Sequence, residues 1–123
     1  MSLLINAFNN QLDAFLTDLQ KAFPNEHYLK TFYNAFLLIK KSHPKQNIYT
    51  FMTYIGPYAS QIHNCDTEFF LQLDNLNVED TYLEKGMRLK HLWQHPDTTE
   101  HTKACIISYT QNLLKLGEKI ISV

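Results

Sequence analysis

The C-terminal part of the chain carries the pattern that most limits what this sequence can fold into. Large apolar residues recur there at spacings of three and four, at Ile106, Tyr109, Leu113, Leu116 and Ile120. That spacing places them on one face of a helix. Asp97 follows Pro96 and precedes Glu100 by three residues, as the N-cap of a capping box does, so we expect a helix of roughly 24 residues after Asp97. It would be roughly 36 Å long at 1.5 Å per residue, and the other helices are expected to pack against its apolar face.

The rest of the chain repeats helical spacing between residues that end helices. Apolar residues run at this spacing from Leu4 to Phe23, and Pro24 disfavours a helical backbone in the residue before it, so a first helix is expected over about residues 3–22. Further helices are expected at about residues 26–41 after the cap Asn25, from Pro44 to a sharp break at Gly56-Pro57, from Pro57 to about residue 63, in a short segment after Asp66, and from Thr81 to about His95. No segment alternates apolar and polar residues as a β-strand does. The sequence therefore predicts an all-α fold, a single compact bundle of five to six helices with the long C-terminal helix packed centrally.

Composition favours one folded domain over residues 1–123. Apolar residues make up 45% of the chain and charged residues 19%, as in folded proteins, and the length suffices to bury a core. The net charge of −1 argues against a strongly basic, non-specific nucleic-acid binder. The first residues lack the pattern of a signal peptide, and no apolar run reaches membrane-spanning length. Cys65 and Cys105 are expected to be free and buried, in a reducing intracellular compartment and not in a secreted protein.

Two histidines four residues apart, His91 and His95, form the best candidate for a metal site, and His101 lies nearby in the sequence. On a helix this spacing lets both imidazoles reach one zinc ion. The glutamate of the zinc-protease motif is missing, so the hypothesis is a structural zinc site. Because Pro96 directly follows His95, the alternative is that these histidines lie on a solvated corner.

Lysines gather at the end of the second expected helix, at Lys40 and Lys41, with Lys45 just beyond it. One interpretation is that they stabilise the negative end of the helix dipole. The other is that they bind phosphate groups, as in a nucleic-acid-associated protein. The nucleic-acid hypothesis also includes Lys85, Arg88 and Lys90.

No arrangement typical of an enzyme is found in the sequence. His63 and Cys65 are two residues apart, so their side chains are expected to diverge and not to form a base and nucleophile pair. The chain has three glycines and no glycine-rich phosphate loop. We therefore expect a non-enzymatic protein, with no cofactor and no small-molecule substrate.

The chain has more tyrosines than a small core already rich in Phe and Leu needs. Tyrosine is enriched at protein interfaces because it joins a large apolar face to a polar tip. The candidate interaction residues are Tyr28, Tyr33, Tyr49, Tyr54, Tyr58 and Trp93. The sequence therefore predicts a protein–protein interaction module that binds another protein or itself, although these residues would also suit ordinary positions at the edge of the core.

Several local motifs follow one another along the chain. They are the amphipathic helix ending at Phe23-Pro24, the Pro44-initiated helix with Phe51, Gly56-Pro57-Tyr58 with Ile62, then Asp66, Phe69-Phe70, Trp93, Tyr109 and Leu113-Leu114. In these motifs the chain resembles a group of small helical proteins encoded by large double-stranded DNA viruses of algae and protists, and its lysine and asparagine bias fits such a genome. The resemblance implies a virus-encoded protein made in the host cell, either an accessory interaction protein or a virion component. It implies no catalytic residues.

Overall fold

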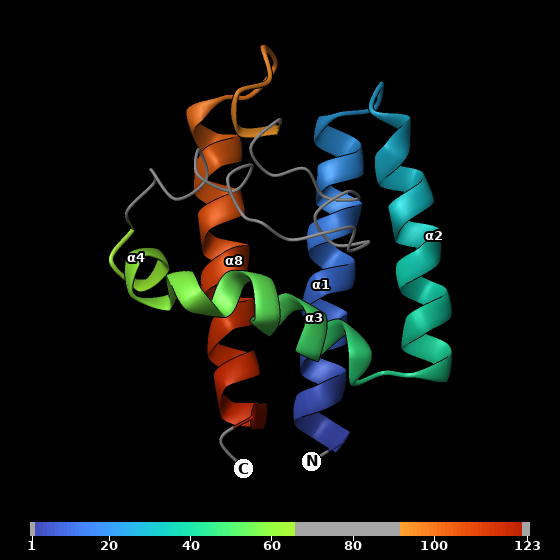
Figure 1. Ribbon diagram of the computed structural model, residues 1–123. Helices are drawn as coiled ribbons and strands as arrows, with labels where there is room; N and C mark the ends of the chain where they lie inside the picture. Colours follow the sequence, from blue (N-terminus) through green and yellow to red (C-terminus); the bar gives the residue numbers. More distant parts are fainter. Residues whose placement is uncertain (1, 66–91, 122–123) are drawn as a thin grey trace.

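A computed structural model describes residues 2–65 and 92–121 of the chain. Within these ranges the chain is helical and contains no strand. The elements are α1 (Ser2–Ala22), α2 (His27–Ser42), α3 (Gln46–Ile55), the 3-10 turn η1 (Gly56–Tyr58), α4 (Ala59–His63) and α8 (Glu100–Ile121) (Figure 1). The all-α prediction is confirmed for this part of the chain. The helices expected after Asp66 and from Thr81 lie outside the described residues.

Three long helices stand side by side, with α1 between α2 and α8 (Figure 1). The chain runs up α1 and down both α2 and α8, so α1 is antiparallel to its two neighbours. α3 and α4 cross in front, where α3 contacts α1, α2 and α8, and α4 contacts α8. The most extensive pairing joins α1 to α8. The C-terminal helix is thus packed against several others, as expected, but of the three long helices α1 and not α8 lies in the middle.

The core is built mainly from phenylalanine, leucine and isoleucine. Its largest fully buried side chains are Phe8, Phe15, Phe23, Phe36, Phe51, Leu12, Leu16, Leu29, Ile48 and Ile62. The rings of Phe8 and Phe51 meet edge to face with their centroids 5.5 Å apart, which fixes α1 against α3. Each such side chain contributes about 1.5–3 kcal/mol on full burial, so the apolar stripe of α1 anchors the bundle.

A buried polar cluster connects α1 to the start of α3. The Nδ2 of Asn9 donates to the backbone oxygens of Ile5 and Pro44, both at 3.1 Å. Asn47 Nδ2 donates to Asn9 Oδ1 at 3.2 Å. Both asparagine side chains are buried among apolar residues. Because a buried amide without partners is costly, these bonds fix how the chain enters α3 beside α1.

The buried face of α8 is wider than the predicted stripe, because α1 packs on one side of it and α3 and α4 on another. Tyr109 and Leu116 of that stripe are half-buried. The fully covered residues are Ile106, Thr110, Leu113, Leu114, Gly117 and Ile120. Gly117 has a clear reason to be small, because a Cβ there would overlap the Sδ atom of Met52 on α3.

The start of α8 differs from the prediction, because the capping residue lies two positions later than expected. The helix begins at Glu100, and Thr99 caps it, since Thr99 Oγ1 accepts the backbone N–H of Thr102 at 3.1 Å. Asp97 does not cap α8 because it lies two residues before the cap, where its backbone N–H donates to Nδ1 of His95 at 3.0 Å. The Oγ1 of Thr98 donates to the Leu92 carbonyl. Residues 97 and 98 therefore complete the turn that precedes the helix.

Three smaller expectations are also corrected. α2 starts at His27 with Glu26 in the capping position and no side-chain capping bond, so Asn25 is not the cap. Gly56 keeps right-handed helical angles, and α3 runs on into η1 and α4 without a sharp break. Both cysteines are free, but neither is buried: Cys65 is exposed and Cys105 half-exposed.

Candidate functional site

Most of the aromatic residues predicted to form an interaction surface lie at the edge of the core. Tyr28, Tyr33, Tyr58 and Trp93 are half-buried and pack against it. The hydroxyl of Tyr33 donates to Asp13 Oδ1 at 2.9 Å, and this bond, with burial and the negative charge of Asp13, raises the pKa of Tyr33. The Nζ of Lys103 lies 5.2 Å from the centre of the Trp93 ring. Tyr49 is exposed, and the side chain of Tyr54 lies outside what the structure describes.

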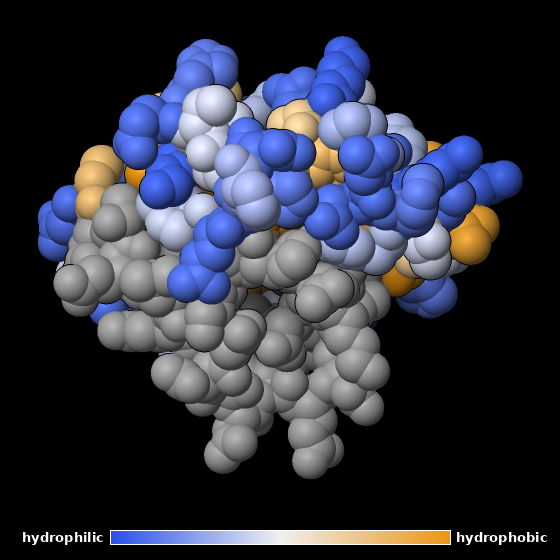
Figure 2. All heavy atoms as spheres, turned by 90° about the horizontal axis from the view of Figure 1, so that it is seen from above, coloured by the Kyte–Doolittle hydropathy of each residue, from blue (hydrophilic) through white to orange (hydrophobic). Residues whose placement is uncertain are grey.

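Tyr49 is one of several exposed apolar and basic residues in the last turns of α2 and the first turns of α3, and we call these residues the α2–α3 corner. It consists of Leu37, Leu38, Lys41, Lys45 and Tyr49. Leu38 is 71% exposed and Tyr49 51% exposed. Lys41 follows Leu38 by three residues on α2, and Tyr49 follows Lys45 by four at the start of α3, so each pair shares a helix face. Seen from the other end of the bundle, the described surface is mostly hydrophilic with separate apolar spots (Figure 2).

The segment of the chain that forms the α2–α3 corner carries lysines but no Asp or Glu. All 12 Asp and Glu residues of the chain lie outside residues 27–65, and this stretch contains Lys30, Lys40, Lys41 and Lys45. Lys41 and Lys45 are exposed and Lys40 is partly exposed, so the lysines of the nucleic-acid hypothesis lie together at this corner. Lys85, Arg88 and Lys90 lie outside the described residues. No carboxylate of the corner's own segment neutralises these lysines.

Of the two histidines four residues apart, the structure describes His95, and both of its ring nitrogens make hydrogen bonds. His95 lies beyond the last helical residue before Pro96, and its Nδ1 accepts the N–H of Asp97. Its Nε2 therefore carries the proton and donates to Glu26 Oε1 at 3.1 Å. His91 lies outside the described residues. Across residues 2–65 and 92–121, no three His, Cys, Asp or Glu side chains come together as a metal site. The zinc site stays a prediction.

His63 and Cys65 diverge, as their spacing predicted. The Nε2 of His63 pairs with Glu118 Oε1 on α8 at 3.0 Å. The Sγ of Cys65 accepts from Gln111 Nε2 at 3.2 Å. The two side chains therefore bind different residues of α8 and form no base and nucleophile pair.

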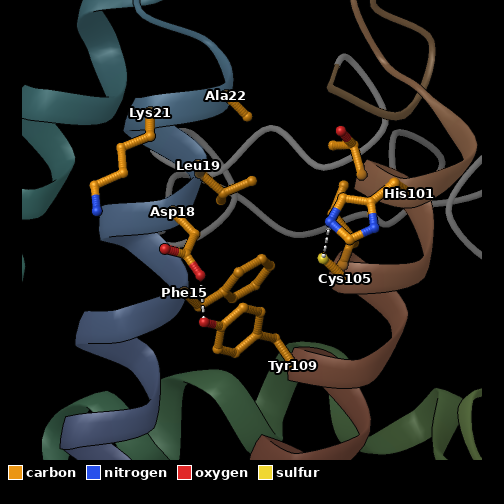
Figure 3. A pocket seen from close by; sticks show the side chains of 10 residues that line it. Phe15, Asp18, Leu19, Lys21, Ala22, His101, Cys105 and Tyr109 are labelled. Atoms are coloured by element: carbon orange, nitrogen blue, oxygen red, sulfur yellow. Dashed lines mark hydrogen bonds between the residues drawn. The ribbon is translucent and has the colours of Figure 1, made fainter.

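A cavity of about 330 Å³ lies between the second half of α1 and the first half of α8 (Figure 3). Its apolar wall is formed by Phe15, Leu19 and Ile106. At its edge, His101 and Cys105 project from α8 one turn apart, with Cys105 Sγ 3.7 Å from His101 Nε2 (Figure 3). Sequence reasoning missed this pair. Their spacing of four residues was readable, but only the packing shows that they face a cavity.

One turn beyond Cys105 on α8, Tyr109 is held in place by two contacts with α1 (Figure 3). Its ring stacks on Phe15 with centroids 4.9 Å apart, and its hydroxyl donates to Asp18 Oδ2. This hydrogen bond, burial and the negative charge of Asp18 raise the pKa of Tyr109 to about 12. Tyr109 therefore stays neutral at physiological pH and joins α8 to α1 beneath the cavity.

Comparisons with known proteins give no match: no family model, curated protein or solved structure matches the chain. Of the helices that the structure describes, none combines the length and apolarity needed to cross a membrane. The structure therefore offers two candidate sites, the α2–α3 corner and the cavity between α1 and α8.

Proposed function

We propose that the whole chain, residues 1–123, is one bundle of five to six helices that acts as a non-enzymatic interaction module. Its α2–α3 corner binds an acidic, amphipathic segment of another protein. The observation that carries this proposal is the exposure of Leu38 and Tyr49 within a stretch of lysines that contains no carboxylate. An apolar centre with a charged rim is the usual anatomy of a protein interface.

The apolar residues of the corner would supply most of the binding energy. Fully covering a leucine is worth about 1.5–3 kcal/mol, and Leu38 has most of its surface available. Tyrosine is enriched among residues that dominate binding energy, and Tyr49 offers its ring beside Lys45.

The lysines would select the partner more than they hold it. Each exposed lysine–carboxylate pair contributes about 0.2–1 kcal/mol. Lys41 and Lys45 flank the apolar side chains, so a partner with carboxylates beside its own apolar face fits the corner best. A basic segment would be repelled.

The resemblance to proteins of large DNA viruses supplies the setting for this proposal. The module would work inside an infected cell, in a reducing compartment, or in the virus particle. Its partner would be a host factor or another chain of the particle.

Site-specific photocrosslinking tests the proposal. Benzoylphenylalanine replaces Leu38 in one variant and Asn112, an exposed residue of α8, in a control variant. In cells that make the protein naturally, the probe at residue 38 should capture one protein through an acidic peptide, and the probe at residue 112 should not. Leu38→Ser should weaken binding of the purified partner at least tenfold, and the charge reversal Lys41→Glu should weaken it severalfold.

Two results would contradict this assignment. Capture of the same proteins from both positions would show that the corner is not the docking site. Crosslinks from residue 38 to nucleic acid would favour the alternative that uses Lys40, Lys41 and Lys45. Salt dependence separates the two functions, because nucleic-acid binding weakens steeply with salt whereas an apolar contact persists.

A further inference from the structure

The cavity between α1 and α8 brings a thiol and an imidazole to the edge of an apolar chamber. Cys105 Sγ and His101 Nε2 are 3.7 Å apart, and both side chains point toward the space between the helices (Figure 3). The chamber lies in the size range of pockets that bind small molecules, at its lower end. Neither residue is needed for the core, since His101 is exposed and Cys105 is half-exposed.

The second thiol of the chain has a different environment. Cys65 is the more exposed of the two, and its sulfur accepts a hydrogen bond from Gln111. Its nearest histidine in sequence, His63, is engaged by Glu118. Exposure alone would therefore make Cys65 the more reactive thiol, whereas an adjacent base would favour Cys105.

We propose that this cavity is a covalent binding site, in which Cys105 captures a small apolar molecule that carries a carbon–carbon double bond conjugated to a carbonyl group. The proposal is independent of the α2–α3 corner. His101, as the neutral imidazole with its lone pair on Nε2, accepts the thiol proton.

The chemical step is a simple addition. The Cys105 sulfur forms a bond to the β-carbon of the alkene while the π bond breaks. The proton taken by His101 is then delivered to the α-carbon. No group leaves and no oxidant or reductant is consumed. The product is a thioether at Cys105.

The walls explain the selection of an apolar molecule. Phe15, Leu19 and Ile106 can cover a hydrocarbon tail. The charged groups of α1 do not compete for the sulfur: Asp18 accepts the hydroxyl of Tyr109, and the amine of Lys21 points away from Cys105 (Figure 3). The apolar tail would therefore lie against α1 while the carbonyl stays near the open edge.

Two probes with the same reactive group test the proposal on the full chain. 1-Octen-3-one carries a five-carbon tail, and methyl vinyl ketone carries only a methyl group. Mass spectrometry of peptides gives the labelling rate at Cys105 and at Cys65 in the same molecule. We expect 1-octen-3-one to label Cys105 at least tenfold faster than Cys65, and to prefer Cys105 more strongly than methyl vinyl ketone does.

His101→Gln separates the roles of base and cavity. Because His101 is exposed, the substitution should not disturb the fold. It should slow labelling at Cys105 at least tenfold and leave the labelling rate of Cys65 unchanged. It should also remove the part of the pH–rate profile at Cys105 that depends on the histidine. If Cys65 were labelled as fast as Cys105 or faster, or if His101→Gln had no effect, the proposal that His101 activates the Cys105 thiol would be wrong. If both ketones showed the same ratio of labelling at Cys105 to labelling at Cys65, the proposal that the cavity binds an apolar tail would be wrong.

Discussion

Replacing Asn9 by alanine tests the buried polar cluster that connects α1 to the start of α3. The substitution removes the donor to the Pro44 carbonyl and the acceptor of the Asn47 amide. Both bonds are between segments that are distant in sequence, so the lost bonds loosen the contact of α1 with α3. Asn10 provides a matched control, because it is the next residue on the same helix and is exposed.

The expected loss follows from the number of bonds. Depriving the buried Asn47 amide of this partner costs about 1–3 kcal/mol, and the bond to the carbonyl of the exposed Pro44 contributes about 0.5–1.5 kcal/mol. Alanine recovers at most about 0.7 kcal/mol through its higher helix propensity. We therefore expect Asn9→Ala to lower the free energy of unfolding by about 1–4 kcal/mol. For a chain of this size the corresponding drop in Tm is on the order of 10 °C.

Urea unfolding followed by circular dichroism measures the difference. Asn10→Ala receives the same gain in helix propensity and loses no buried bond, so its unfolding free energy should stay within about 0.5 kcal/mol of the parent. If the two variants were equally stable, the bonds of Asn9 would have no net effect and the cluster would not position α3.

Two further predictions concern α8. Tyr109→Phe should have a lower free energy of unfolding than the parent at neutral pH. This difference should become smaller as pH rises from about 10 to about 12. The reason is that the phenol loses its proton near pH 10 in the unfolded chain but only near pH 12 in the folded one, so the stabilisation is complete below pH 10 and is lost above it. Urea titrations across that range give the difference, and a constant difference would contradict the assignment. In the variant Met52→Ala, Gly117→Ala should raise the free energy of unfolding by about 1 kcal/mol through helix propensity. In the parent, the same substitution should stabilise less or destabilise, because the new Cβ would overlap the side chain of Met52. Equal effects in both backgrounds would show that Met52 moves aside without cost.

The long helices were predictable because their local and tertiary signals agree. The apolar spacing of α1 and the proline after Phe23 predict a helix over about residues 3–22, and the structure has it at Ser2–Ala22. The start of α8 was missed because Asp97, Thr98 and Thr99 are all good capping residues. Only the contacts with His95 and Leu92 decide which of them caps the helix.

The candidate sites depended even more on packing. Tyrosine content predicted an aromatic surface, yet Tyr28, Tyr33 and Tyr58 pack against the core, and composition does not report burial. The lysines at the end of α2 were visible in the sequence. The exposure of the neighbouring Leu37 and Leu38 was not visible, because leucine is an apolar residue that the sequence alone would assign to the core.

The pairing of α1 with α8 has a consequence for how the protein is made. Residues 23–99 separate the two helices in the sequence, and among the described helices α1 and α8 form the most extensive contact. Closing so long a loop delays folding relative to local contacts. During synthesis, the ring of Phe15 has to wait for Tyr109, which is made long after it. Until α8 has been made, α1 presents part of its apolar face to solvent, so the nascent chain is exposed to aggregation or to chaperones.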